Sequence, residues 1–166
     1  MLVTIPGLLD APRLARVREL LDGARFVDGR LSAGTAARRV KNNQELEPEA
    51  AVMEELNRIV MGALVRHPTF NAAAMPLKVA TPFYARYRPG MTYGDHVDDP
   101  VMGPAGGRYR SDVSTTVYLN GPEEYAGGEL VVHTPFGSQE VKLAAGDAIL
   151  YPSSSLHRVA EVTSGE

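Results

Sequence analysis

Residues 87–98, YRPGMTYGDHVD, contain the pattern around which the rest of the chain must be arranged. The stretch ends in a His-x-Asp pair, His96 and Asp98, and residues two apart on a strand project from the same face. An imidazole and a carboxylate there supply two ligands to a divalent metal, and His157 on a facing strand would complete a two-histidine, one-carboxylate triad. Such a triad leaves coordination positions open for a co-substrate and dioxygen, so the pattern predicts an Fe(II) centre inside a β fold.

The histidines allow other interpretations as well. A His-x-Asp pair is common by chance, and His157 alone also fits a structural histidine in a core or at a strand edge. We interpret His67 as structural, at a helix C-terminus before Pro68, where a partial positive charge complements the helix dipole. His133 ends an expected strand and is interpreted as a surface group.

The carboxylates and the missing thiols narrow the choice of ligands. Asp95 and Asp99 flank the pattern, and on a regular strand both point away from Asp98, so they are second choices for the carboxylate ligand. The chain has no cysteine. This excludes a disulfide framework and any thiolate zinc or iron–sulfur site, and leaves histidines and carboxylates as the only good ligands.

The length and charge of the chain limit its class. With 166 residues and a mass of 17.9 kDa, we expect a single domain over residues 1–166. A net charge of −3 and a pI near 5.8 give no basic field, which disfavours a nucleic-acid partner. The N-terminus lacks the pattern of a secretion signal and no stretch reaches membrane-spanning length, so we expect no membrane partner and a cytoplasmic location.

The first half of the chain predicts two helices. A strand-like start at 2–5 is followed by a helix over 12–22, with Asp10 as its cap and Gly23 as its end. Residues 26–44 are polar and irregular, and we interpret them as a surface loop. Apolar residues at helical spacing predict a second helix that begins at Pro48, ends before Pro68 and packs on a sheet.

From Leu77 onward the apolar period changes to two, which indicates short strands. We expect strands around 79–87, 113–119, 129–133, 141–143 and 148–151. Residues 100–110, which include five Gly or Pro residues, are expected to form a mobile loop beside the site. The expected fold is α+β: a helical part over 1–76 and a β-rich core over 77–166, in which two N-terminal helices pack on the sheet of a jelly roll, also called a double-stranded β-helix.

Several motifs together resemble one family. They are Phe26-x-Asp28-Gly29-Arg30 with Ala33-Gly34, Val40-Lys41-Asn42-Asn43-Gln44, Tyr93-Gly94-x-His96-Val97-Asp98, Arg110-Ser111-Asp112-Val113-Ser114, Gly127-Gly128-Glu129-Leu130 and Leu150-Tyr151-Pro152-Ser153-Ser154-Ser155-Leu156-His157. Over nearly its whole length the chain is similar to the bacterial PKHD-type hydroxylases, relatives of the prolyl 4-hydroxylases. The resemblance implies an Fe(II)- and 2-oxoglutarate-dependent dioxygenase on a double-stranded β-helix, associated with ascorbate (vitamin C) and, in some members, with iron uptake.

The resemblance also implies roles for residues. His96, Asp98 and His157 would be the iron ligands, Tyr87 would lie near the 2-oxoglutarate, and Tyr93 would line its pocket. The implied reaction couples the oxidative decarboxylation of 2-oxoglutarate, which yields succinate and CO2, to oxidation of a substrate. A small molecule or a peptide is the expected substrate, and nothing in the sequence identifies it further.

One part of the resembled pattern is not found in the chain. In that family a basic residue lies on the last core strand, about ten positions after the distal histidine, and pairs with the distal carboxylate of 2-oxoglutarate. In this chain both that residue and its strand would fall beyond Glu166. Arg158 is the only cation after His157. Arg110 and Lys78 are the alternatives for binding the distal carboxylate. A missing last strand would leave an open sheet edge, so we expect a homodimer, aggregation or a longer chain.

Two other functions fit part of the pattern. A jelly roll that binds metal without oxygenase activity, acting as an iron sensor or a binding module, would also use the triad. A cupin-like isomerase would need a His-x-His pair, which the sequence lacks. Succinate formation without added substrate separates the first alternative from the dioxygenase.

Overall fold

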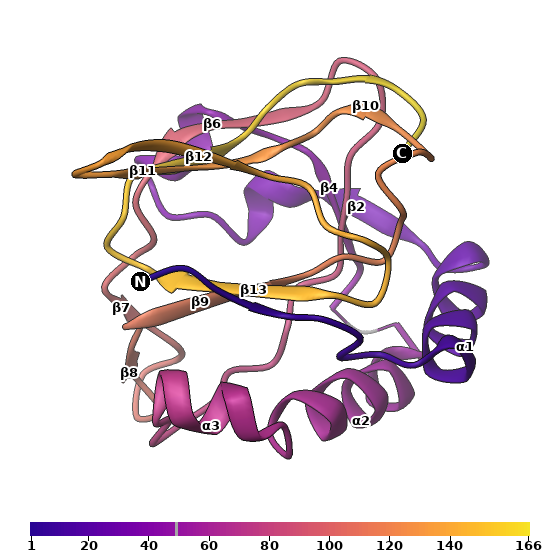
Figure 1. Cartoon of the computed structure of the whole chain (residues 1–166). Helices are drawn as coiled ribbons and strands as arrows, with labels where there is room; N and C mark the ends of the chain where they lie inside the picture. Colours follow the sequence, from indigo (N-terminus) through magenta and orange to yellow (C-terminus); the bar gives the residue numbers. More distant parts are fainter. Residues whose placement is uncertain (49) are drawn as a thin grey trace.

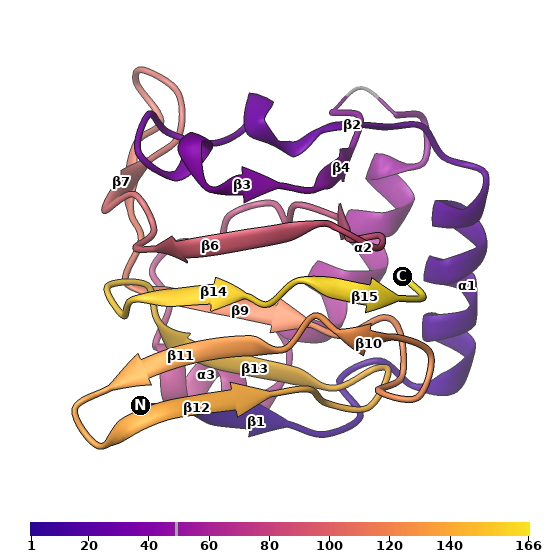
Figure 2. The ribbon, with the colours of Figure 1, turned by 90° about the horizontal axis from the view of Figure 1, so that it is seen from above.

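Two antiparallel sheets lie face to face and form the body of the protein (Figure 1). The structure is a computed structural model and describes residues 1–48 and 50–166. One sheet has the order β1-β13-β9, with bounds Val3–Ile5, Ala148–Pro152 and Val113–Val117. The other has the order β12-β11-β14-β6-β3, with bounds Gly137–Val141, Leu130–Thr134, His157–Val159, Thr92–His96 and Lys41–Asn42. Seen from above, these five strands lie side by side over the first sheet (Figure 2).

Three smaller pairings complete the β structure. They comprise a sheet of β2 (Phe26–Asp28), β4 (Gln44–Leu46) and β5 (Ala85–Arg86), the pair β10 (Ala126–Gly127) with β15 (Val162–Ser164), and the pair β7 (Val101–Met102) with β8 (Tyr109–Arg110). The last pair adds to a prediction, because residues 100–110, expected to be a mobile loop, contain two short paired strands. The strand expected over 141–143 lies earlier, as β12, and the strand expected over 79–87 is reduced to β5.

The protein has three helices among its described residues, α1 (Ala11–Asp22), α2 (Met53–Leu64) and α3 (Pro68–Ala74). Helices α2 and α3 lie on the side of the β1-β13-β9 sheet that faces away from the second sheet, and α1 stands beside α2 at one end of the two sheets (Figure 1). The cap predicted for α1 is present, since the Asp10 side chain accepts a hydrogen bond from the Arg13 amide at 3.0 Å. None of the described helices is both long and apolar enough to cross a membrane.

The prediction of two helices is wrong about where the second helix begins and about the number of helices. Helix α2 begins at Met53, and Pro48 lies in a turn before it. Pro68 does not only end a helical stretch but also starts α3, as proline does at the first position of a helix. His67 is therefore the N-cap of α3: its Nδ1 accepts from the Thr69 amide at 3.3 Å. It is structural, as expected, but not as a cation at a helix C-terminus.

Strand β13 holds the layers together because its side chains alternate between them. Leu150 is fully buried on the helix side, in a cluster with Ile5, Leu64 and Phe70. Ile149 points to the other side and packs between the two sheets, in a cluster with Tyr118, Leu130, Val132 and Tyr151. Full burial of one such aliphatic side chain contributes about 1.5–3 kcal/mol. The central strand thus fixes the spacing of the sheets.

Residues 26–44, predicted to be a surface loop, are instead part of the β structure. They contain β2, β3 and the start of β4, together with the single turns Gly29–Leu31 and Ala37–Arg39. Lys41, Asn43 and Glu45 in and beside them are buried. Strands of two or three residues are too short to show a period of two, so their pairing with β5 and β6 could not be predicted from the local pattern.

Replacing Gly127 in β10 with alanine is expected to lower the free energy of unfolding by about 3 kcal/mol. Gly127 has a φ of +73°, and a Cβ there would lie 2.0 Å from the backbone oxygen of Glu161. A left-handed backbone costs an alanine about 1–2 kcal/mol, and overpacking costs about 1–3 kcal/mol. Equilibrium unfolding in urea measures the loss.

The matched control for this substitution is Gly90→Ala. Gly90 has a φ of +84° but open space around its missing side chain, so only the backbone cost applies. The loss should therefore be clearly smaller than for Gly127. Equal losses in the two variants would show that the close approach of Glu161 is not what requires glycine at position 127.

Candidate metal centre

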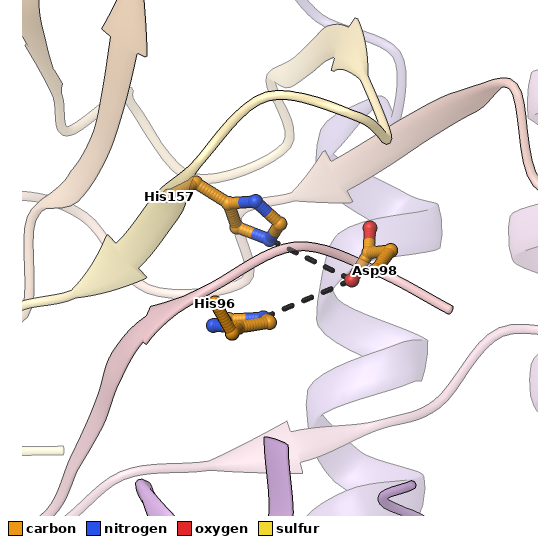
Figure 3. Close-up of side chains that lie close together, drawn as sticks. All are labelled: His96, Asp98 and His157. Carbon is orange, nitrogen blue, oxygen red and sulfur yellow. Dashed lines mark ion pairs between the residues drawn. The ribbon is translucent and has the colours of Figure 1, made fainter. Parts of the chain in front are cut away.

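The three predicted ligands converge between the two sheets (Figure 3). His96 ends β6, Asp98 follows it, and His157 begins the neighbouring strand β14, where it is paired directly with His96. Both imidazole Nε2 atoms lie 3.7 Å from Oδ1 of Asp98. That distance is too long for a direct hydrogen bond, and the three ligand atoms lie within 4.8 Å of one another. The arrangement can therefore surround a single ion.

The backbone fixes which nitrogen of each histidine faces the centre. Nδ1 of His96 lies 2.8 Å from the carbonyl oxygen of Gly94, and Nδ1 of His157 lies 2.9 Å from that of Ser155. A carbonyl only accepts, so Nδ1 must carry the proton and donate it. Each Nε2 then presents a lone pair to the centre, as a metal ligand must. Burial also lowers the pKa of His96, which favours the neutral ligand form.

A bulge in β6 brings Tyr93 onto the same face as His96. His96 pairs with His157 and Tyr93 with Val159, so three steps along β6 oppose two along β14. The Tyr93 ring consequently stacks on the His96 ring, with centroids 3.6 Å apart and planes within 9°. Burial raises the pKa of Tyr93 to about 12, so its hydroxyl keeps its proton at neutral pH.

Two more tyrosines, Tyr151 and Tyr87, have partners in or beside the centre. Tyr151 stands edge-on to the His157 ring, with centroids 5.0 Å apart. Tyr87, expected near the co-substrate, follows β5. Burial raises the pKa of both Tyr87 and Tyr151, and Tyr93 and Tyr151 add to the rise of the pKa of Tyr87. Tyr151 was not predicted as a site residue, although it is the last residue of the strand expected over 148–151, six positions before His157.

A buried ion pair lies behind Tyr93. The Lys41 ammonium donates to Oε1 of Glu45 at 2.5 Å and to Oγ of Ser32 at 3.0 Å, and both members of the pair are buried. The ammonium also lies 5.2 Å from the centroid of the Tyr93 ring. Sequence reasoning missed this pair, because the only signal was its place in and beside the VKNNQ motif of residues 40–44.

The second-choice carboxylates point elsewhere. Asp95 lies on the outer face of the sheet, where its Oδ1 is 3.2 Å from Nε2 of His133 and its Oδ2 is 3.8 Å from the Arg158 guanidinium. Asp99 is exposed, and its carboxylate packs against Gly34. His133 is a partly exposed group near a strand end, as the sequence predicted.

The three cations considered for the distal carboxylate of a co-substrate also lie outside the centre. Arg110 is exposed and pairs with Asp112 at 3.0 Å. Lys78 donates to the carbonyl oxygen of Gly107 at 2.9 Å, and Arg158 faces Asp95 on the outer surface. These partners hold all three cations away from the triad, contrary to the idea that Arg110 or Lys78 points into the barrel.

The donor set fits Fe(II). Two neutral imidazole nitrogens and one carboxylate oxygen, with no thiolate in the chain, form the facial triad of non-haem iron oxygenases. Closed structural zinc sites use four protein ligands, whereas the described residues bring only three together here. The arrangement can thus hold an ion and leave positions for other molecules.

Comparison with known sequences agrees with this chemistry. The model of the 2OG-Fe(II) oxygenase superfamily matches residues 82–166. A PKHD-type hydroxylase of Thioalkalivibrio sulfidiphilus is 61% identical over 166 residues, which are 100% of this chain and 74% of that protein. A PKHD-type hydroxylase of Stenotrophomonas maltophilia strain R551-3 is 48% identical over 166 residues, 99% of this chain and 74% of the relative.

Comparison with solved structures supports the jelly-roll fold. A prolyl-4-hydroxylase of Pseudomonas putida superimposes with a TM-score of 0.65 and 18% identity, over 98% of this chain and 86% of that one. A viral collagen prolyl hydroxylase of Paramecium Bursaria Chlorella virus-1, solved as a 2OG complex, gives a TM-score of 0.60 and 20% identity over 99% of this chain and 90% of that one. At these identities the likeness establishes the fold.

Proposed function

Because the chain belongs to the 2OG-Fe(II) oxygenase superfamily, we propose that His96, Asp98 and His157 hold the Fe(II) ion of its active site. Its similarity to the PKHD-type hydroxylases identifies it as a 2-oxoglutarate-dependent dioxygenase that acts as a hydroxylase. The observation that carries the assignment is the convergence of two Nε2 lone pairs and one carboxylate oxygen, with both histidines locked by backbone carbonyls.

The residues around the centre would bind the ion, orient the side chains that hold it and shield it from water. When bound, Fe(II) supplies the redox chemistry that converts 2-oxoglutarate and O2 to succinate and CO2 and inserts one oxygen atom into the substrate. Tyr93 covers the flat face of His96 and fixes the plane of that ring. Tyr151 limits the movement of His157 from its edge. Together they keep the two imidazoles in place.

We propose that the co-substrate lies beside Tyr93 and Tyr87. In support, Tyr93 contacts the ligand His96 directly, and Tyr87 lies near both Tyr93 and Tyr151. Burial keeps these phenols protonated, so each hydroxyl is available to donate a hydrogen bond to a carboxylate. The residue that pairs with the distal carboxylate is not assigned.

We also propose partners and a cellular setting for the protein. A small molecule or a peptide is the proposed substrate and ascorbate the proposed reductant. The link to iron uptake comes from the family resemblance, and the proposed location is cytoplasmic. A homodimer is supported by β9, which ends its sheet and has no strand partner on its outer side among the described residues. Such edges invite pairing with a second chain.

Incubation with Fe(II), ascorbate and 2-oxoglutarate is expected to yield succinate above background even without the substrate. His157→Ala is the matched control, because it removes one ligand and leaves the rest of the centre in place. Succinate measured by mass spectrometry should fall to background in the variant and decrease when ascorbate is omitted. Tight metal binding without any succinate would instead favour a metal-binding module or iron sensor.

A further inference from the structure

The two carboxylate oxygens of Asp98 have different neighbours. Oδ1 faces Nε2 of His96 and of His157, each at 3.7 Å. Oδ2 points away from the histidines and accepts a hydrogen bond from the hydroxyl of Ser114 on β9. One oxygen is therefore directed at the centre, while the other is held by the opposite sheet.

Three serine hydroxyls form a chain that ends on this carboxylate. Oγ of Ser114 lies 2.8 Å from Oγ of Ser153, and Oγ of Ser111 donates to Ser153 at 3.1 Å. Each hydroxyl has one proton, and that of Ser114 goes to Asp98, which can only accept as a carboxylate. Ser153 must therefore donate to Ser114, and the chain runs in one direction, from Ser111 through Ser153 and Ser114 to Asp98.

Ser153 is the buried centre of this chain. It is 1% exposed, and its backbone also joins the two sides of the site. Its amide donates to the carbonyl oxygen of Asp112 at 3.1 Å, and its carbonyl oxygen accepts from the Asp98 amide at 3.2 Å. A buried hydroxyl costs free energy unless it is hydrogen-bonded, and Ser153 meets that cost with two hydroxyl partners. The loop that precedes His157 is thereby tied to Asp98.

We propose that Ser114, supported by Ser153, is a positioning residue that makes Asp98 a ligand through Oδ1 alone; this rests on the metal centre proposed above. A hydrogen bond to Oδ2 opposes a second contact between the carboxylate and the ion. A carboxylate that binds through one oxygen occupies one coordination position and leaves the others to the co-substrates. Ser114 touches neither the ion nor the substrate and acts through Asp98.

The test is a titration of the metal-free protein with Co(II), followed by visible absorption, in two variants of nearly identical shape. Ser114→Thr keeps the hydroxyl and Ser114→Val removes it, and both β-branched side chains suit a strand. We expect Thr to bind Co(II) like the wild type. We expect Val to bind about 10–100-fold more weakly, as for other losses of hydrogen bonds to metal ligands, with a changed ligand-field spectrum. Equal affinity and equal spectra in the two variants would overturn the proposal.

Two further variants keep the result interpretable. Ser154→Ala changes an exposed serine of the same loop and should leave both readouts unchanged. If circular dichroism shows that Ser114→Val is unfolded, Ser153→Ala decides instead, with weaker Co(II) binding expected and wild-type binding as the contrary result. Failure of the wild type to bind Co(II) would reject the metal centre itself. Binding that is lost in His157→Ala but unaffected by the serine substitutions would reject the positioning role alone.

Discussion

Replacing Asp98 with alanine is expected to abolish tight metal binding. A structural zinc ion contributes about 10–16 kcal/mol through four ligands, or about 3–4 kcal/mol for each. Losing one of three ligands should therefore weaken binding by about 10²–10³-fold. The expectation for His96→Ala is the same. Anaerobic titration with Fe(II) or Co(II), read by calorimetry, gives the dissociation constants.

The neighbouring Asp99→Ala is the control for that experiment. Asp99 has the same charge and is one residue away, but its side chain is exposed and is not part of the triad. It should keep the affinity of the wild type, which separates the loss of a ligand from the loss of a nearby negative charge. Wild-type metal affinity in Asp98→Ala, or loss only in Asp99→Ala, would show that the carboxylate has been misassigned.

Replacing Lys41 with alanine is expected to lower the free energy of unfolding by about 3–5 kcal/mol, the usual cost of removing one partner of a buried ion pair. The cause is Glu45, which would remain buried with its charge uncompensated. Because whole domains are stable by only about 5–15 kcal/mol, this is a large fraction of the total. Urea unfolding followed by circular dichroism measures it.

A double substitution tests whether the uncompensated charge is the cause. Lys41→Met combined with Glu45→Leu removes both charges and keeps apolar volume, so it should recover most of the lost stability. Arg16→Ala, which breaks an ion pair with Glu55 on the surface, should have a far smaller effect. If the double variant were as unstable as Lys41→Ala, the loss would come from packing and not from charge.

The residues that could be predicted from the sequence are those whose signals are local or have a strict chemical requirement. The cap, the helical stretch and the terminal glycine of α1 lie within fourteen consecutive residues, and the structure reproduces them to within one residue. The His-x-Asp pair at the end of β6 and the distal His157 stood out because the triad needs two histidines and the chain has only four. The structure brings these three together.

The features that were missed depend on contacts between distant segments. Lys41 and Glu45 look like ordinary surface charges until β3 pairs with β6 and β4 with β5. Tyr93 reaches the face of His96 only because β6 contains a bulge, which a strict period of two does not predict. Helix α3 is seven residues long and starts at a proline that also ends the preceding helical pattern.

The hydrogen bonds from Nδ1 of the two histidines give the centre an uneven mutational robustness. Their acceptors are the main-chain carbonyls of Gly94 and Ser155, and no single amino-acid exchange can delete a main-chain carbonyl. The carboxylate Asp98 depends instead on the Ser114 side chain, which a single exchange removes. Random mutagenesis should therefore inactivate the centre more often through the groups that support its aspartate than through those that orient its imidazoles.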